Sequence, residues 1–144
     1  MADVVLSPYL SFADGKTRSV IEFYKSIFGG KLYLQTFGDF KHPDESKKDL
    51  VMHSRLTSDD VDIMASDTMD DSKLTVGNNV SLSLSGTDGE KLKKFWAGLS
   101  EGGTITDELS TKPWGDEFGM LVDKFGINWL VNITSAENAA QQSG

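Results

Sequence analysis

An internal repeat constrains the fold of this chain more strongly than any other feature of its sequence. The stretch "YLSFADGKTRSVIEFYKSIFGGKLYL" at 9–34 aligns without a gap on "SLSLSGTDGEKLKKFWAGLSEGGTIT" at 81–106, with Phe23 on Phe95. Each copy passes from an alternating strand pattern to an amphipathic helix, and then to a glycine that favours the left-handed conformation in which helices end. The spacing therefore indicates two copies of one strand–helix unit.

Both copies continue into further strands. The patterns predict strands at 31–38, 49–57 and 61–67 after the first helix, and at 104–110, 118–123 and 127–134 after the second. Turn-forming residues, in "TSDDVD" and "DKFG", separate the last two strands of each copy. The sequence thus predicts an α+β fold in which tandem βαβββ modules form a cupped mixed sheet. We expect a single domain over 1–144, with modules at 5–68 and 78–134 and a flexible tail at 135–144.

The composition excludes several classes of partner and chemistry. A formal charge of −8 makes nucleic acid and anionic membranes unfavourable partners. The absence of cysteine excludes disulfides, cysteine-ligated zinc and thiolate nucleophiles. The first residues do not have the pattern of a signal peptide, and no apolar run is long enough to span a membrane, so we expect a cytoplasmic protein.

Four stretches of the chain resemble one branch of a known superfamily. The stretches "YLSFADG…IEFYKSIFGG", "VMHSRL", "DIMASD" and "WGDEFGMLVDKFGINWLV" are similar to PhnB-like members of the vicinal oxygen chelate superfamily, which includes glyoxalase I, extradiol dioxygenases and bleomycin resistance proteins. The resemblance covers 5–134. It implies the glyoxalase/bleomycin resistance/dioxygenase fold, a small-molecule ligand held in a cavity between the modules, and a homodimer.

Some relatives in this branch carry a methyltransferase label. A methyl-donor cofactor would suit a glycine-rich turn between a strand and a helix, whereas "EGGTITDE" leads into a strand. We therefore expect no cofactor.

The resemblance also implies where a metal would bind. The metalloenzymes of the superfamily hold one divalent ion with ligands from the first and last strands of each module. Aligned by strand pattern, these positions are Ser7 and Asn79 on the first strands, and Met64 and Leu130 on the last strands. Zinc, manganese and iron need imidazole or carboxylate donors, which these side chains do not supply. The sequence predicts that the metal site is absent.

Strand alternation predicts which side chains line a ligand cavity. Ser7 and Tyr9 alternate with the apolar Leu10, and the pattern of "VMHSRL" turns His53 and Arg55 away from the helix. The expected cavity residues are Ser7, Tyr9, His53, Arg55, Met64, Asn79, Trp114 and Leu130. Such a cavity suits a small polar or amphipathic ligand.

Three of these residues have two interpretations each. His53 is the candidate catalytic residue, because imidazole can act as acid, base or ligand near neutral pH, or it is a strand histidine held by one hydrogen bond. Arg55 can hold an anionic ligand bidentately or pair with a nearby carboxylate. Trp114 is an aromatic wall for the ligand, or a structural plug or dimer contact. We expect it on a turn whose conformation Gly115 permits and the Asp116 side chain fixes.

Two classes of function remain open. The first is a metal-free protein that binds a small molecule. The second is a glyoxalase- or dioxygenase-like enzyme that uses a metal, or chemistry centred on His53. In both classes we expect the exposed sheet edges to be covered in a homodimer.

Overall fold

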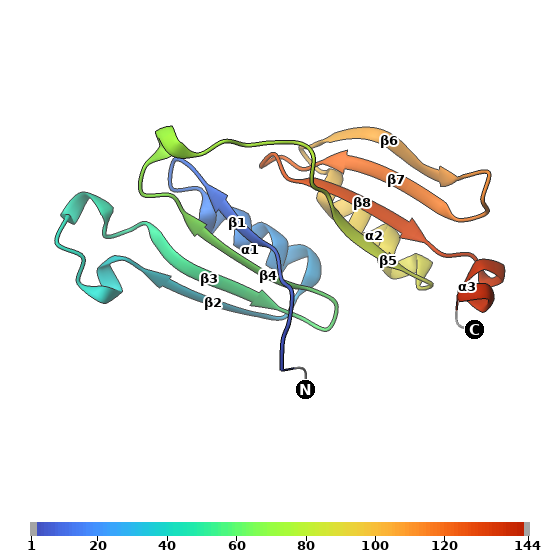
Figure 1. Ribbon diagram of the computed structural model, residues 1–144, viewed down its shortest axis with the longest axis horizontal. Helices are drawn as coiled ribbons and strands as arrows, with labels where there is room; N and C mark the ends of the chain where they lie inside the picture. The colour runs from blue at the N-terminus through green and yellow to red at the C-terminus, as the bar shows by residue number, and fades with distance from the viewer. Residues whose placement is uncertain (1–2, 143–144) are drawn as a thin grey trace. The chain divides into compact units, whose positions relative to one another are not determined.

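The computed structural model describes residues 3–142, and the chain divides into two compact units between Thr75 and Val76. The first unit contains β1 (Tyr9–Phe12), α1 (Thr17–Phe28), β2 (Lys31–Thr36), β3 (Val51–Thr57), β4 (Asp62–Asp67) and three 3-10 turns, η1 (Gly38–Phe40), η2 (Glu45–Lys47) and η3 (Asp71–Lys73). The second contains β5 (Leu82–Gly86), α2 (Gly89–Ser100), β6 (Thr104–Thr111), β7 (Glu117–Val122), β8 (Asn128–Ile133) and α3 (Ala136–Gln142). The predicted α+β fold of two βαβββ modules is confirmed, with one sheet in each module (Figure 1).

The two four-stranded sheets have the same topology. Their strand orders are β1-β4-β3-β2 and β5-β8-β7-β6, and in each sheet only the first and last strands of the module run parallel. Each long helix covers one face of its own sheet (Figure 1). The two helices occupy positions that the repeat aligns, since both the starts and the ends of α1 and α2 correspond.

The pairing of first and last strands differs between the modules. Leu10 pairs with Ala65 in the first sheet. The repeat also aligns 60–68 with 126–134, which would place Leu82 opposite Val131, but Leu82 pairs with Trp129. The second sheet is thus shifted by two residues at this pair of strands.

Each module has its own apolar core between helix and sheet. In the first, the buried residues include Val20, Ile21, Tyr24, Leu56 and Ala65; in the second they include Leu92, Phe95, Trp96, Leu99, Leu121, Trp129 and Val131. Gly119 of β7 lies directly under the second helix. A Cβ atom there would come within 2.7 Å of the Trp96 ring and 2.8 Å of the Leu109 backbone, so this strand position accepts no side chain.

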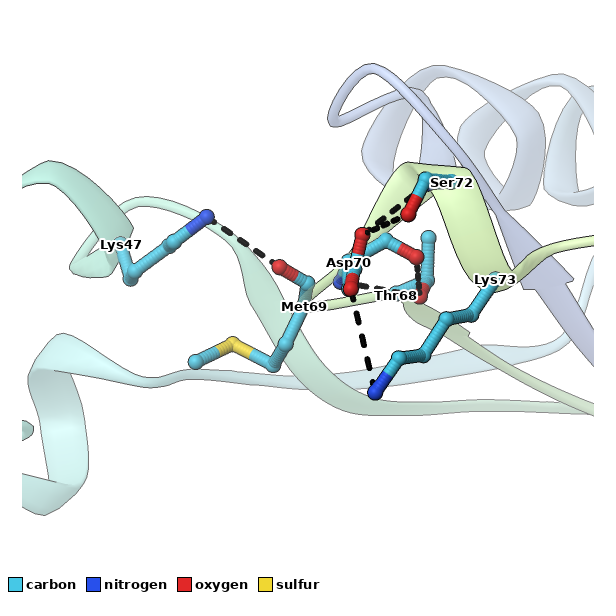
Figure 2. Close-up of polar contacts among 6 residues, drawn as sticks. All are labelled: Lys47, Thr68, Met69, Asp70, Ser72 and Lys73. Atoms are coloured by element: carbon cyan, nitrogen blue, oxygen red, sulfur yellow. Dashed lines mark hydrogen bonds and ion pairs between the residues drawn. The ribbon is translucent and has the colours of Figure 1, made fainter.

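The long connection between β2 and β3 is tied to the segment that follows β4. Lys47 donates from Nζ to the carbonyl of Met69 at 3.2 Å (Figure 2). The receiving segment is shaped by its own side chains, because the Asp70 carboxylate accepts from the backbone N–H and hydroxyl of Ser72, and Thr68 bonds the backbone of Asp70. The bond from Lys47 thus joins the connection between β2 and β3 to a segment whose own side chains define its conformation.

The C-terminal segment contains a short helix, and the flexibility that we expected of it stays a prediction. Over Ala136–Gln142 the chain forms the short helix α3, and the side chain of Asn138 bonds both Trp114 and Asp116. Residues 143–144 of the expected tail lie outside the described part. Among residues 3–142, no helix is long and apolar enough to cross a membrane.

Candidate functional site

The helix-free face of the first sheet carries most of the predicted cavity residues. The strand register places Tyr9, Met64, Arg55 and Tyr33 in one row across β1, β4, β3 and β2. Their neighbours along the strands alternate onto the helix side, where Leu56 and Ala65 are fully buried. We call this surface the polar face, defined by Ser7, Tyr9, Tyr33, His53, Arg55, Asp62 and Met64.

Three aromatic rings meet on the polar face. The Tyr9 hydroxyl lies 2.9 Å from Nδ1 of His53, and the two rings stack with centroids 5.7 Å apart. Tyr33 also lies against the imidazole, with centroids 6.5 Å apart and the rings tilted by 58°. Tyr9 and Tyr33 are 49% and 54% exposed, so their rings remain open to a ligand. His53 therefore has the single hydrogen bond expected of a strand histidine. The exposed rings beside it can also stack on an aromatic molecule.

Arg55 makes a bidentate ion pair with Asp62. Its Nε and Nη2 donate to the two carboxylate oxygens at 2.8 and 2.7 Å, and the Ser7 hydroxyl donates to the same carboxylate at 3.1 Å. The hydrogen bond from Arg55 lowers the pKa of Asp62, and the same bond raises the pKa of Arg55. Of the two roles predicted for Arg55, the structure shows the pairing with a carboxylate.

In the second unit, Trp114 lies on the turn between β6 and β7. The turn is closed by the N–H of Gly115, which donates to the carbonyl of Lys112, and Gly115 has a φ of 102° that favours glycine. The Trp114 ring is 55% exposed and meets Phe118 edge to face at 6.0 Å. The predicted role of Gly115 is thus confirmed.

Asp116 fixes this turn to the end of the chain. Its carboxylate is buried and accepts hydrogen bonds from Asn132 Nδ2, the N–H of Ser135 and Asn138 Nδ2 at 2.7–3.0 Å. Asn138 also donates to the Trp114 carbonyl at 2.8 Å, so α3 and the turn share one network. The predicted role of Asp116 is confirmed, and it extends to α3.

The Asp116 network predicts that α3 detaches in acid. Hydrogen bonds from Asn132, Ser135 and Asn138 lower the pKa of Asp116 below its usual 3.8. A lowered pKa means that the contribution to stability is present above the usual carboxyl value and is lost as the pH falls through the folded value. We expect the Ser135 backbone and Asn138 side-chain amide resonances to keep their positions from about pH 7 to about pH 5 and to shift below about pH 4. If the same resonances still shift below about pH 4 in Asp116→Asn, protonation of Asp116 is not the cause of the shift.

The remaining predicted residues have different positions. Leu130 lies on the helix-free face of the second sheet, between Ser83 and Met120. Asn79 was expected on the first strand of the module, but β5 begins only at Leu82, and Asn79 lies in an exposed bend. One cavity lined by residues of both units remains a prediction, as does the homodimer.

Tyr33 was not among the cavity residues expected from the sequence. Its signal was present in "KLYLQT", where Leu32 and Leu34 alternate with Tyr33 and so turn it away from the helix. Alternation within β2 could not show which residue of β3 lies beside Tyr33. The strand register shows that this residue is Arg55.

The positions that would hold the superfamily's metal do not supply suitable ligands. The Ser7 hydroxyl donates to Asp62, and Met64 and Leu130 carry no oxygen or nitrogen donor in their side chains. Within residues 3–142, no three side chains of His, Cys, Asp or Glu are grouped so that they could hold a metal ion. The residues present at these positions therefore do not fit a divalent metal.

The fold is that of glyoxalase/bleomycin resistance/dioxygenase proteins. An enzyme of this kind from Burkholderia phytofirmans superimposes with a TM-score of 0.57, covering 88% of this chain and 97% of the other, at 14% identity. The family model described as 3-demethylubiquinone-9 3-methyltransferase matches residues 5–132, and the chain belongs to this family.

Three relatives are similar over most of their length. Protein YjdN of Escherichia coli K12 is 29% identical, over 92% of this chain and 97% of its own. The structure of PA1353 from Pseudomonas aeruginosa is 30% identical with a TM-score of 0.78, covering 91% of this chain and 98% of the other. A PhnB protein from Bacillus cereus, described as a putative 3-demethylubiquinone-9 3-methyltransferase, is 24% identical with a TM-score of 0.74, covering 91% of this chain and 100% of the other.

Proposed function

We propose that this protein binds a small polar or amphipathic molecule on the polar face, without the metal site of the superfamily. The observation that carries the proposal is the arrangement of Tyr9, His53 and Tyr33. The two tyrosines are half exposed, and the imidazole that both rings contact provides a polar group at the centre. Apolar or aromatic walls around a few polar groups are typical of small-molecule sites.

The donor chemistry favours binding over metal-dependent catalysis. An enzyme of the glyoxalase or dioxygenase type would need carboxylates or imidazoles at positions such as Ser7, Met64 and Leu130. The methyltransferase activity in the family's description is not part of the proposal, because the chain has no glycine-rich strand–turn–helix for a methyl donor.

Imidazole resonances provide a direct test, since the chain has only two histidines. We expect p-cresol, as an aromatic probe with one hydroxyl, to shift the ring resonances of His53 and not those of His42. His53→Ala should weaken probe binding at least about fivefold, which corresponds to roughly 1 kcal/mol for a lost hydrogen bond and ring contact. His42→Ala, in the connection between β2 and β3, is the matched control and should leave the affinity unchanged.

Two results would contradict the proposal. One is stoichiometric zinc, manganese, nickel or iron in protein purified without added metal, which would favour the enzyme. The other is a probe affinity that His42→Ala and His53→Ala reduce equally.

A further inference from the structure

The ion pair on the polar face bears on the charge of the ligand. Arg55 uses Nε and Nη2 on Asp62, which matches the planar fork of the guanidinium to both carboxylate oxygens. An anionic ligand would have to displace this carboxylate, which Ser7 also holds. The Arg55–Asp62 pair therefore has almost no net charge, and Nε and Nη2 of the guanidinium are already bonded to the Asp62 carboxylate.

The charge around this pair is mainly negative. The turn that leads into β4 carries Asp59 and Asp60, and the whole chain has a formal charge of −8. Lys31 is a cation at the edge of this sheet, where it begins β2 opposite Thr57, at the margin of the face. The net charge of the whole chain is repulsive to a carboxylate or phosphate.

The aromatic part of the face, by contrast, has unused binding capacity. Nδ1 of His53 is engaged by Tyr9, whereas Nε2 has no partner among the described residues. The Tyr9 and Tyr33 rings are about half exposed beside it. A planar ring could stack there while one polar group bonds Nε2.

We infer that the polar face selects an uncharged aromatic ligand that carries one hydrogen-bonding group, and that the Arg55–Asp62 pair excludes anions. This inference rests on the proposed function and names the class of ligand for the same site. The pair acts as a specificity element, because it removes the charge that would otherwise attract carboxylates.

A matched pair of probes tests the inference. p-Cresol and p-toluate are similar in size and shape but differ in charge near neutral pH. We expect the wild-type protein to bind p-cresol at least about tenfold more tightly, measured from the His53 and tyrosine ring resonances. Asp62→Asn keeps the shape of the side chain and removes the negative charge that neutralises the guanidinium, so p-toluate affinity should rise about tenfold, the range of one charge-assisted hydrogen bond.

The control separates release of Arg55 from a general change in charge. Asp59→Asn removes one negative charge from the neighbouring turn without touching Arg55, and it should change p-toluate affinity less than about twofold. An equal effect of both variants would overturn the role of the ion pair, and so would an unchanged p-toluate affinity in Asp62→Asn. A wild-type preference for p-toluate would overturn the ligand class while leaving the proposed function in place. If neither probe shifts the rings, both proposals fail.

Discussion

Asp123→Ala is expected to destabilise the protein by about 4 kcal/mol, because three hydrogen bonds lose their acceptor at once. The carboxylate is 3% exposed and accepts from the N–H groups of Phe125 and Ile127 and from the Trp129 indole, at 2.9–3.1 Å. Alanine leaves three donors in or near the core without this acceptor. Each unsatisfied buried donor costs about 1–3 kcal/mol, and water entering the turn would recover part of that sum.

Urea unfolding followed by tryptophan fluorescence measures this effect. Asp123→Asn should lose about half as much, because its Oδ1 still serves the two backbone donors while its amide opposes the indole N–H. Trp129→Phe, made in the Asp123→Ala background, should cost less than it does alone, since the indole has already lost its partner. A loss below about 1 kcal/mol for Asp123→Ala would show that the carboxylate does not hold the turn.

Asp67→Ala should have the second largest effect, about 3 kcal/mol, in the first unit. The Asp67 carboxylate accepts from the N–H of Thr17 at 3.0 Å and from the N–H of Val51 at 2.7 Å, and it is 4% exposed. Lys16 precedes α1 without a side-chain cap, so Asp67 supplies the missing acceptor at the start of the helix. Its loss leaves two buried donors unpaired.

Hydrogen exchange locates this effect as well as measuring it. Faster exchange is expected at the start of α1 and the start of β3, the two places that Asp67 joins. Asp59→Asn, in an exposed turn of the same unit, is the control and should stay within about 0.5 kcal/mol of the wild type. If Asp67→Asn were as stable as the wild type, one side-chain oxygen would be enough for both segments, and the expectation that both carboxylate oxygens are needed would be wrong.

Local patterns predicted the parts of the fold that depend on alternation and spacing. The repeat placed both long helices, because apolar residues on one helical face and a following glycine are visible within one short window. Alternation placed Tyr9, His53 and Arg55 on the helix-free side for the same reason, since the side chains of a strand alternate with a period of two.

Contacts between distant residues were beyond such patterns. Asp67 bonds Thr17 and Val51, which lie 50 and 16 residues away along the chain, and no local pattern around Asp67 shows either contact. The helix α3 was expected to be a flexible tail because its segment contains few apolar residues. Ser135 and Asn138 in this segment bond Asp116, and no local pattern specifies these contacts.

The two-residue shift of β5 along β8 shows how two modules of one topology can differ and still keep their cores. A slip of one residue would exchange the core and the exposed face of the strand. A slip of two keeps Leu82 and Leu84 toward the helix while giving each a new neighbour, Trp129 and Val131. Sheets of duplicated modules can therefore change in even steps without losing their cores. Each step brings different side chains into line on the open face, which lets one half of a duplicated protein acquire a chemistry that the other half does not have.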